Sequence, residues 1–397
     1  MSRPTLEVAD IIRAAGKRFI ENNRRWLRWP HLKVLQAIER CRTAALGGHR
    51  DRCNRCGHEA ISFNSCRNRH CPKCQTNARE KWLDARSQEL LDVPYAHVVF
   101  TLPHELAPLA FHNKKIVYGL LFRASAATLL EIAADPKHLG ADIGFLSVLH
   151  TWGQNLLHHP HVHCVVPSGG LSPDHQQWVH PSCSSFFLPV KVLSRVFRGK
   201  FVDGLKRAFH RGNLVFPGPL RPLVQEKAFR SFLRQLYRHD WVVYARRPFG
   251  GPQHVLQYLA RYTHRVAISN HRLIDFTDGK VTFRWKDYAH GNKKRKMTLS
   301  ADEFLRRFLL HLLPRGFVRI RFFGFLANRR RAALLPLCRQ LLDAKRHLWM
   351  SSPAAETGRT AVWLCPQCGG PMVVVERFSA QQIRSESTRK ASFVDTS

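Results

Sequence analysis

The sequence predicts an α+β fold, an antiparallel sheet with flanking helices that follows an N-terminal zinc ribbon. Strand-like runs meet through short hairpin connections, helical patterns lie between them, and two CxxC pairs gather at residues 53–74. Strands joined by hairpins form antiparallel sheets, and helices gathered on one side of such a sheet give the α+β class. Paired CxxC knuckles with no secretory context are typical of metal ligands.

The N-terminal cysteine cluster predicts one structural Zn²⁺ site. Cys53 with Cys56 and Cys71 with Cys74 form two knuckles, and each knuckle of a zinc ribbon supplies two thiolates to a tetrahedral ion. Helices expected over residues 30–41 and 77–91 flank the ribbon.

Further polar residues lie within and around the second knuckle. Cys66, His58 or His70 could replace one of the four ligands or hydrogen-bond to them, so the ligand set stays open. We expect the basic residues of this region to form a face that contacts DNA phosphates: Arg67, Arg69 and Lys73, with Asn68 among them.

The central part of the chain alternates strand and helix patterns. Gly and Pro clusters separate the expected elements, and Thr277-Asp278-Gly279 predicts a tight hairpin turn. The expected strands are residues 96–102, 143–150, 161–167, 241–247 and a hairpin over 272–285, and the expected helices are residues 116–134, 190–209, 228–237 and 301–313.

Two of these strands carry a candidate metal site. Successive side chains of a strand point to opposite faces, so His161 and His163 share one face while Val162 points into the core. A hairpin would bring His150, eleven residues before His161, beside the pair as a third ligand. Three protein ligands leave coordination positions open for a phosphate oxygen.

A helix expected over residues 251–269 carries the candidate nucleophiles. Tyr258 and Tyr262 are four residues apart and therefore lie on one helical face. Arg261 and Arg265 lie beside them and are candidate phosphate-binding residues. A free tyrosine has a pKa near 10, so its attack on phosphorus needs a cation and in-line positioning.

Composition favours nucleic acid as the partner. The chain has 63 Lys and Arg against 28 Asp and Glu, a formal charge of +35 and a pI near 10.7. We find no apolar stretch of 18 residues, which argues against membrane association. Charged residues punctuate the first 28 positions, so we expect no signal peptide and a cytoplasmic protein.

The C-terminal region holds half a zinc knuckle, Cys365 and Cys368. Cys338 with a histidine, or another subunit, could complete a site, but we favour a vestige within a partly disordered tail. The Ser-rich segment after Phe378 is poor in aliphatic residues, which is typical of disorder.

Together these motifs resemble the two-tyrosine HUH transposases of rolling-circle insertion sequences, the insertion-sequence-ninety-one family. The resemblance rests on the His-Val-His triplet, the helix segment YLARYTHRVAIS, the cysteine cluster and the run PRGFVRIRFFGFLANRRR, and it extends to about Arg331. It implies an HUH endonuclease domain with His161 and His163 as metal ligands and Tyr258 and Tyr262 as nucleophiles. His150 matches the third ligand of related relaxases, whereas some small HUH transposases use a Gln on the tyrosine helix, so Gln257 and His254 remain alternatives.

The resemblance also implies a reaction and its partners. A tyrosine nicks single-stranded DNA at element ends and target, forms a 5′-phosphotyrosine and leaves a 3′-hydroxyl for the host replication machinery. The resemblance implies Mg²⁺ or Mn²⁺, although imidazole ligands alone suit zinc or manganese better than magnesium.

Two other functions compete with this prediction. A replication initiator or relaxase with the same chemistry is disfavoured because no GxxxxGK[ST] helicase motif occurs. A non-catalytic zinc DNA-binding protein, such as a decayed copy, is disfavoured by the intact histidines and tyrosines. The expected domains are residues 1–92 with the ribbon, 93–275 with the nuclease, 276–345 as a basic αβ extension and 346–397 as the tail.

Overall fold

The computed structural model describes residues 4–182, 188–249, 267–287, 291, 293–346 and 363–383. The chain forms two compact units, and each is assembled from separate segments. The first comprises Met1–Ala78, Ile268–Arg306 and Ser352–Ser397, and the second comprises Arg79–Ala267 and Arg307–Ser351. The sequence predicted four consecutive domains, whereas in the structure described residues from near both ends of the chain lie in the first unit.

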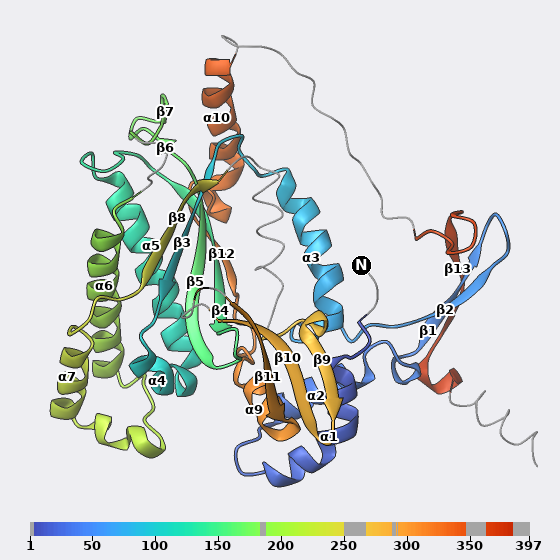
Figure 1. Cartoon of the computed structure of the whole chain (residues 1–397). Helices are drawn as coiled ribbons and strands as arrows, with labels where there is room; N and C mark the ends of the chain where they lie inside the picture. The colour runs from blue at the N-terminus through green and yellow to red at the C-terminus, as the bar shows by residue number, and fades with distance from the viewer. Residues whose placement is uncertain are drawn as a thin grey trace, which may run out of the picture. The chain divides into compact units, whose positions relative to one another are not determined.

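The second unit is built on a five-stranded antiparallel sheet (Figure 1), as the predicted α+β class requires. Pairing sets the strand order β12-β4-β5-β3-β8, and every neighbouring pair is antiparallel. The strands are β3 (Tyr95–Thr101), β4 (Gly144–Trp152), β5 (His158–Pro167), β8 (Val243–Phe249) and β12 (Ile320–Gly324).

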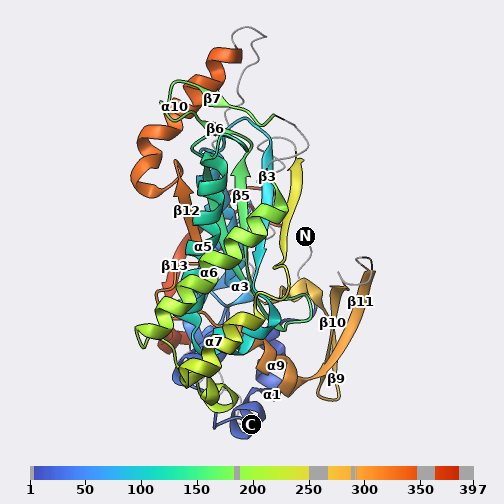
Figure 2. The same cartoon turned by 90° about the vertical axis from the view of Figure 1, so that its left-hand side faces the viewer.

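Helices α5 (Lys114–Ala134) and α6 (Val190–His210) pack side by side along one face of this sheet (Figures 1 and 2). Alternate strand residues such as Val98, Phe100 and Val162 form the main core with them. Two shorter helices of this unit are α4 (Ala107–His112) and α7 (Glu226–Gln235), and a two-stranded ribbon pairs β6 (Gly170–Leu171) with β7 (Trp178–Val179).

The opposite face of the sheet has its own apolar cluster. Val148 and Val165 pack there with Leu335 and Cys338 of α10 (Asn328–Arg346). Consecutive residues of each strand therefore lie on opposite faces of the sheet. This alternation decides which face the histidines of β4 and β5 occupy.

The expectation that no apolar stretch reaches 18 residues is wrong. Helix α5 is long and apolar enough to span a membrane by length and composition, but 72% of its most apolar window is buried within the structure. A core helix of a globular unit passes the same test, and α5 supplies many residues of the main core.

The first unit combines helices α1 (Val8–Asn22) and α2 (Trp29–Arg40) with two three-stranded antiparallel sheets. The predicted hairpin is confirmed, because β9 (Leu273–Thr277) pairs with β10 (Lys280–Asp287) through Asp278 and Gly279. Both turn residues have positive φ, 51° and 69°, as a tight hairpin turn requires. β11 (Lys293–Ser300) completes this sheet and leads into α9 (Ala301–Leu310).

The other sheet of this unit joins the two ends of the chain. β1 (Gly48–Cys53) pairs with β2 (Glu59–Phe63) on one side and with β13 (Met372–Phe378) on the other. Residues 372–378 of the tail thus form a strand of a folded sheet, so the tail that was expected to be partly disordered is ordered at this strand. α3 (Pro72–Ser87) begins five residues before the helix predicted at 77–91.

Candidate metal centres

Three predicted ligand histidines lie together on the central strand pair of the five-stranded sheet. His150 of β4 is directly opposite His161 of β5, and Val148 is opposite His163. Since residues two apart on a strand share a face, all three imidazoles occupy the face opposite α5 and α6. The hairpin expected from the sequence is what brings His150 to the pair.

The distances within this histidine cluster suit a shared cation. One ring nitrogen from each of the three side chains lies within 4.8 Å of the others. The ring centroids are 5.4 Å apart for His150 and His161, 4.3 Å for His150 and His163, and 4.9 Å for His161 and His163. Three such nitrogens on one side of an ion leave its other side open to a ligand.

Hydrogen bonds orient the imidazoles toward one another. Nδ1 of His161 donates to the backbone carbonyl of His159 at 2.7 Å, which leaves Nε2 as the lone-pair nitrogen. Nδ1 of His163 lies 2.9 Å from Nε2 of His97, and the two rings stack with an interplanar angle of 5°.

His97 is a member of this site that the sequence analysis missed. It lies on β3, the other neighbour of β5, and is buried. It alternates with the core residues Ala96 and Val98, so the strand pattern places its side chain on the opposite face of the sheet, where the other histidines lie. Its contact with His163 depends on the register between two strands that are distant in the sequence.

Burial keeps the imidazoles of His161 and His163 neutral. Desolvation, with a smaller contribution from the neighbouring His159, lowers the pKa of His161 to about 3. Desolvation also lowers the pKa of His163 well below its ordinary value, and the charges of His150, His161 and His97 act in the same direction. A metal ligand must be neutral imidazole, so near pH 7 no proton has to leave before a cation binds.

The remaining predicted residues of the nuclease site lie outside the described part of the chain. These are the nucleophile candidates Tyr258 and Tyr262, the phosphate-binding candidates Arg261 and Arg265, and the alternative third ligands His254 and Gln257.

Two clusters of four cysteines are present in the first unit. The first contains Cys41, Cys66, Cys71 and Cys74, and the sulfur of Cys74 is 3.5 Å from those of Cys41 and Cys66. Sulfurs bound at about 2.3 Å to a tetrahedral ion are about 3.8 Å apart, so the cluster has the size of a structural zinc site.

The predicted grouping of Cys53, Cys56, Cys71 and Cys74 into one site is wrong. Cys53 and Cys56 instead lie with Cys365 and Cys368, while the first cluster takes Cys66, an alternative ligand in the sequence analysis, and Cys41, which was missed. The cause is strand pairing, because β1 places its C-terminal cysteine beside β13. Within the described residues, neither His58 nor His70 belongs to a ligand group.

Lys73, one of the residues predicted to contact DNA phosphates, is not exposed in the structure. Arg67 and Arg69 are exposed, but the Lys73 side chain is buried and its Nζ lies 2.5 Å from a carboxylate oxygen of Glu7. This ion pair fixes the start of α3 against the residue that precedes α1. Lys73 therefore stabilises the zinc-binding region instead of binding phosphate.

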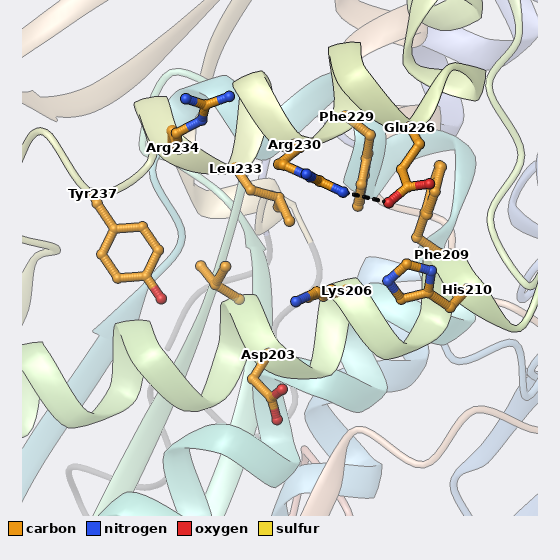
Figure 3. A pocket seen from close by; sticks show the side chains of 11 residues that line it. Asp203, Lys206, Phe209, His210, Glu226, Phe229, Arg230, Leu233, Arg234 and Tyr237 are labelled. Atoms are coloured by element: carbon orange, nitrogen blue, oxygen red, sulfur yellow. Dashed lines mark hydrogen bonds and ion pairs between the residues drawn. The ribbon is translucent and has the colours of Figure 1, made fainter.

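A separate groove lies between α6 and α7 (Figure 3). Its volume is about 380 Å³, and basic side chains such as Lys206 and Arg234 line it beside Phe209. Arg230 is paired with Glu226 at 2.7 Å across the helix surface. None of the three clustered histidines lines this groove, so it is not part of their site.

Two family models match segments of the chain that contain these clusters. A family model described as "Putative transposase" matches residues 144–333, which include the histidine cluster. A second, described as "Transposase zinc-binding domain", matches residues 11–102, which include all four cysteines of the first cluster.

Two curated proteins are similar over most of the chain. The "Putative transposase y4qJ" of Sinorhizobium fredii is 54% identical over 395 residues, covering 95% of this chain and 97% of that protein. The "Transposase for insertion sequence element IS801" of Pseudomonas savastanoi pv. phaseolicola is 30% identical over 352 residues, covering 87% and 83%. No solved structure matches the chain.

Proposed function

Because this chain belongs to the IS91 family of transposases, we propose that it moves an insertion sequence by nicking single-stranded DNA with a tyrosine nucleophile. The observation that carries the proposal is the cluster of His150, His161 and His163. It lies on one face of the sheet, within the segment that the transposase model matches. Three imidazoles whose ring nitrogens lie close together can form the ligand set of a catalytic divalent cation.

The proposed cation is Mn²⁺ or Mg²⁺, held by Nε2 of His161 and by the ring nitrogens of His150 and His163. Imidazole ligands favour Mn²⁺ of the two. Bound there, the ion would supply a positive charge for a phosphodiester oxygen. The contribution of the chain is to hold the ligands in place, through the carbonyl of His159 and the ring of His97.

We assign Tyr258 and Tyr262 as the nucleophiles, with Arg261 and Arg265 as phosphate-binding residues. The phenolic oxygen forms a bond to phosphorus, the bond from phosphorus to the 3′ oxygen breaks, and that oxygen takes up a proton. The products are a 5′-phosphotyrosine and a free 3′-hydroxyl. The bond energy stays in the aryl ester, so a later 3′-hydroxyl can reverse the step and join strands without ATP.

Two tyrosines four residues apart in the sequence would allow a rolling-circle mode of transposition. The first would hold the 5′ end of the element while the second opens the far end, and the 3′-hydroxyl would be extended by the host replication machinery in the cytoplasm. The zinc-binding domain, for which we propose the Cys41, Cys66, Cys71 and Cys74 cluster as the ligand set, would bind DNA through exposed residues such as Arg67 and Arg69.

The test is covalent trapping of DNA. The purified protein is incubated with labelled single-stranded oligonucleotides that carry the element ends, with Mn²⁺, with Mg²⁺ and without metal, and adducts are resolved under denaturing conditions. We expect a metal-dependent adduct with the wild-type protein and with each of Tyr258→Phe and Tyr262→Phe. The double variant should form none, because phenylalanine keeps the ring and removes only the hydroxyl.

His163→Ala separates chemistry from DNA binding. It should abolish the adduct and retain salt-sensitive DNA binding, since most of the affinity comes from Lys and Arg contacts to phosphate. An adduct with the double phenylalanine variant would refute the nucleophile assignment. DNA binding without any adduct, by an intact wild-type protein with its own element ends, would instead indicate a non-catalytic DNA-binding protein.

A further inference from the structure

The cysteine pairs near the two ends of the sequence have the same backbone geometry. Both segments, residues 53–57 and 365–369, read Cys-x-x-Cys-Gly. In each, the glycine N–H donates to the carbonyl of the first cysteine, at 3.0 Å in the first segment and 2.9 Å in the second. The glycines have similar positive φ values, 72° for Gly57 and 68° for Gly369. Two matching turns each direct a pair of sulfurs to one side.

The four sulfurs of these turns lie close together. The sulfur of Cys53 is 3.5 Å from that of Cys368, and the sulfur of Cys56 is 3.6 Å from that of Cys365. All four lie within 4.8 Å of one another. A disulfide needs about 2.05 Å between sulfurs, whereas the edge of a tetrahedral zinc–thiolate site is about 3.8 Å. The spacing therefore fits a bound ion and not a pair of disulfides.

The backbone around the cluster leaves space only for the sulfurs. A Cβ on Gly370 would lie 3.1 Å from the sulfur of Cys53, 3.3 Å from that of Cys368 and 2.9 Å from Cβ of Arg55. A side chain at this position would therefore press on two ligand atoms at once. In addition, the backbone N–H of Arg55 donates to the sulfur of Cys53 at 3.4 Å, a bond that favours thiolate.

Apolar packing around this cluster is sparse. Its buried residues are Cys53, Cys365 and Met372, with Ala60 and Cys368 packed against them. The next residues of β13, Val373, Val374 and Val375, are exposed by 39%, 44% and 45%. A core this small contributes little stability, and small folds of this kind depend on a metal or on disulfides.

We propose that Cys53, Cys56, Cys365 and Cys368 bind a second Zn²⁺, separate from the one at the Cys41 cluster. This second ion holds strand β13 against β1. The C-terminal pair lies outside both matched family models, which end at residues 102 and 333. The ion links residues 309 positions apart, as Cys56 and Cys365 are. The sheet β13-β1-β2 can therefore form only after the C-terminal segment is available, and its stability depends on the metal.

The experiment is zinc analysis of the full-length protein, purified under reducing conditions, with matched double variants. Cys365→Ser with Cys368→Ser should lose one zinc per chain relative to the wild type, and Cys71→Ser with Cys74→Ser should lose a different one. Combining the four substitutions should remove both. Cys338→Ser is the control, because Cys338 is a buried cysteine that belongs to neither cluster, and its zinc content should equal that of the wild type.

Two further measurements distinguish metal binding from a folding defect. Cys368→His keeps a ligand atom and should retain the zinc that the serine variant loses. Limited proteolysis should cut near Arg377 of β13 in the Cys365→Ser, Cys368→Ser variant and in chelator-treated wild type, and leave the zinc-loaded wild type intact there. Unchanged zinc in that double variant, or a wild type with disulfides among these cysteines, overturns the proposal. None of these readouts depends on DNA cleavage.

Discussion

At the scale of single residues, His97 decides how firmly the histidine cluster is held. Removing its ring in His97→Ala leaves Nδ1 of His163 without the partner now at 2.9 Å, so the ligand ring can turn. Losing a residue that orients a metal ligand typically weakens metal affinity about 10–100-fold. We expect adduct formation to require correspondingly more Mn²⁺, measured as the half-saturating concentration.

The matched control for this prediction is His104→Ala, because the His104 side chain is 91% exposed. His97→Gln can still hydrogen-bond to His163 and should recover part of the metal affinity. Raised Mn²⁺ should restore the adduct yield of His97→Ala, which a merely unfolded site would not allow. The same half-saturating Mn²⁺ in His97→Ala and the wild type would show that His97 has no positioning role.

The residues of the candidate sites differ in how far the sequence could predict them. His150, His161 and His163 follow from local rules, since period-two alternation and one hairpin bring them together. His97 and Cys41 reach their partners through contacts between segments that are far apart in the sequence. No local pattern states which of several CxxC pairs will share an ion.

At the scale of elements, the backbone conformation at the C-terminal end of β12 requires a glycine. Gly324 has φ of 61° and pairs with Gly144 of β4, and a Cβ built on it would lie 1.7 Å from the carbonyl oxygen of Ile143. Gly324→Ala must therefore displace the strand as well as adopt an unfavourable φ. We expect a loss of about 3 kcal/mol or more in the free energy of unfolding, measured in urea.

Gly316→Ala separates these two causes. Gly316 has a similar φ of 71°, but an added Cβ meets nothing within 4 Å, so only the backbone cost of about 1–2 kcal/mol applies. Equal losses for the two variants would mean that the close approach of β12 to β4 has no effect on stability at this point.

The start of β5 makes stability depend on pH through His158. Burial, followed by the charges of His311 and Lys114, lowers the pKa of His158 to about 3, and its Nε2 lies 2.7 Å from the hydroxyl of Tyr118. The unfolded side chain has a pKa near 6.5. Between these values the unfolded state binds a proton that the folded state does not, so stability falls as pH decreases from about 6.5 towards 3.

His158→Gln should remove this contribution. The slope of unfolding free energy against pH below 6.5 should become shallower by up to about 1.4 kcal/mol per pH unit, the value for one proton. The comparison uses slopes, so a general loss of stability in the variant does not affect it. His104→Gln, at a highly exposed position, should keep the wild-type slope, and an unchanged slope in His158→Gln would contradict the assignment.

The elements themselves were largely predictable where their patterns are local. The hairpin at Asp278 and Gly279, the strand pair of β4 and β5, and helix α5 follow turn chemistry and periodicity. β13 was not predicted, because its burial pattern is mostly exposed and its strand partner β1 lies near the other end of the chain. The pairing of β13 with the distant strand β1 gives a regular structure to a segment that was expected to lie in a partly disordered tail.

At the scale of the whole molecule, the charge of +35 makes DNA binding strongly dependent on salt. Each phosphate contact to single-stranded DNA lowers the slope of log affinity against log salt by about 0.7, because a condensed counterion is released. The edge strand β11 concentrates this charge, since Lys293, Lys294, Arg295 and Lys296 are consecutive and exposed. Arg295 is paired with Asp287 at 3.1 Å, so the three lysines are the better candidates for phosphate contacts.

The triple variant Lys293→Gln, Lys294→Gln, Lys296→Gln should make the salt slope shallower by up to about 2, the value expected when three phosphates are no longer bound. The matched control removes the same charge from exposed ion pairs, as Arg13→Gln, Arg207→Gln, Arg230→Gln. Fluorescence anisotropy with a labelled single strand, titrated at several salt concentrations, gives both slopes. If β11 binds the backbone of DNA, only the lysine variant changes its slope. If net charge alone attracts DNA, the two variants weaken binding equally, and the assignment of β11 as a DNA-binding strand fails.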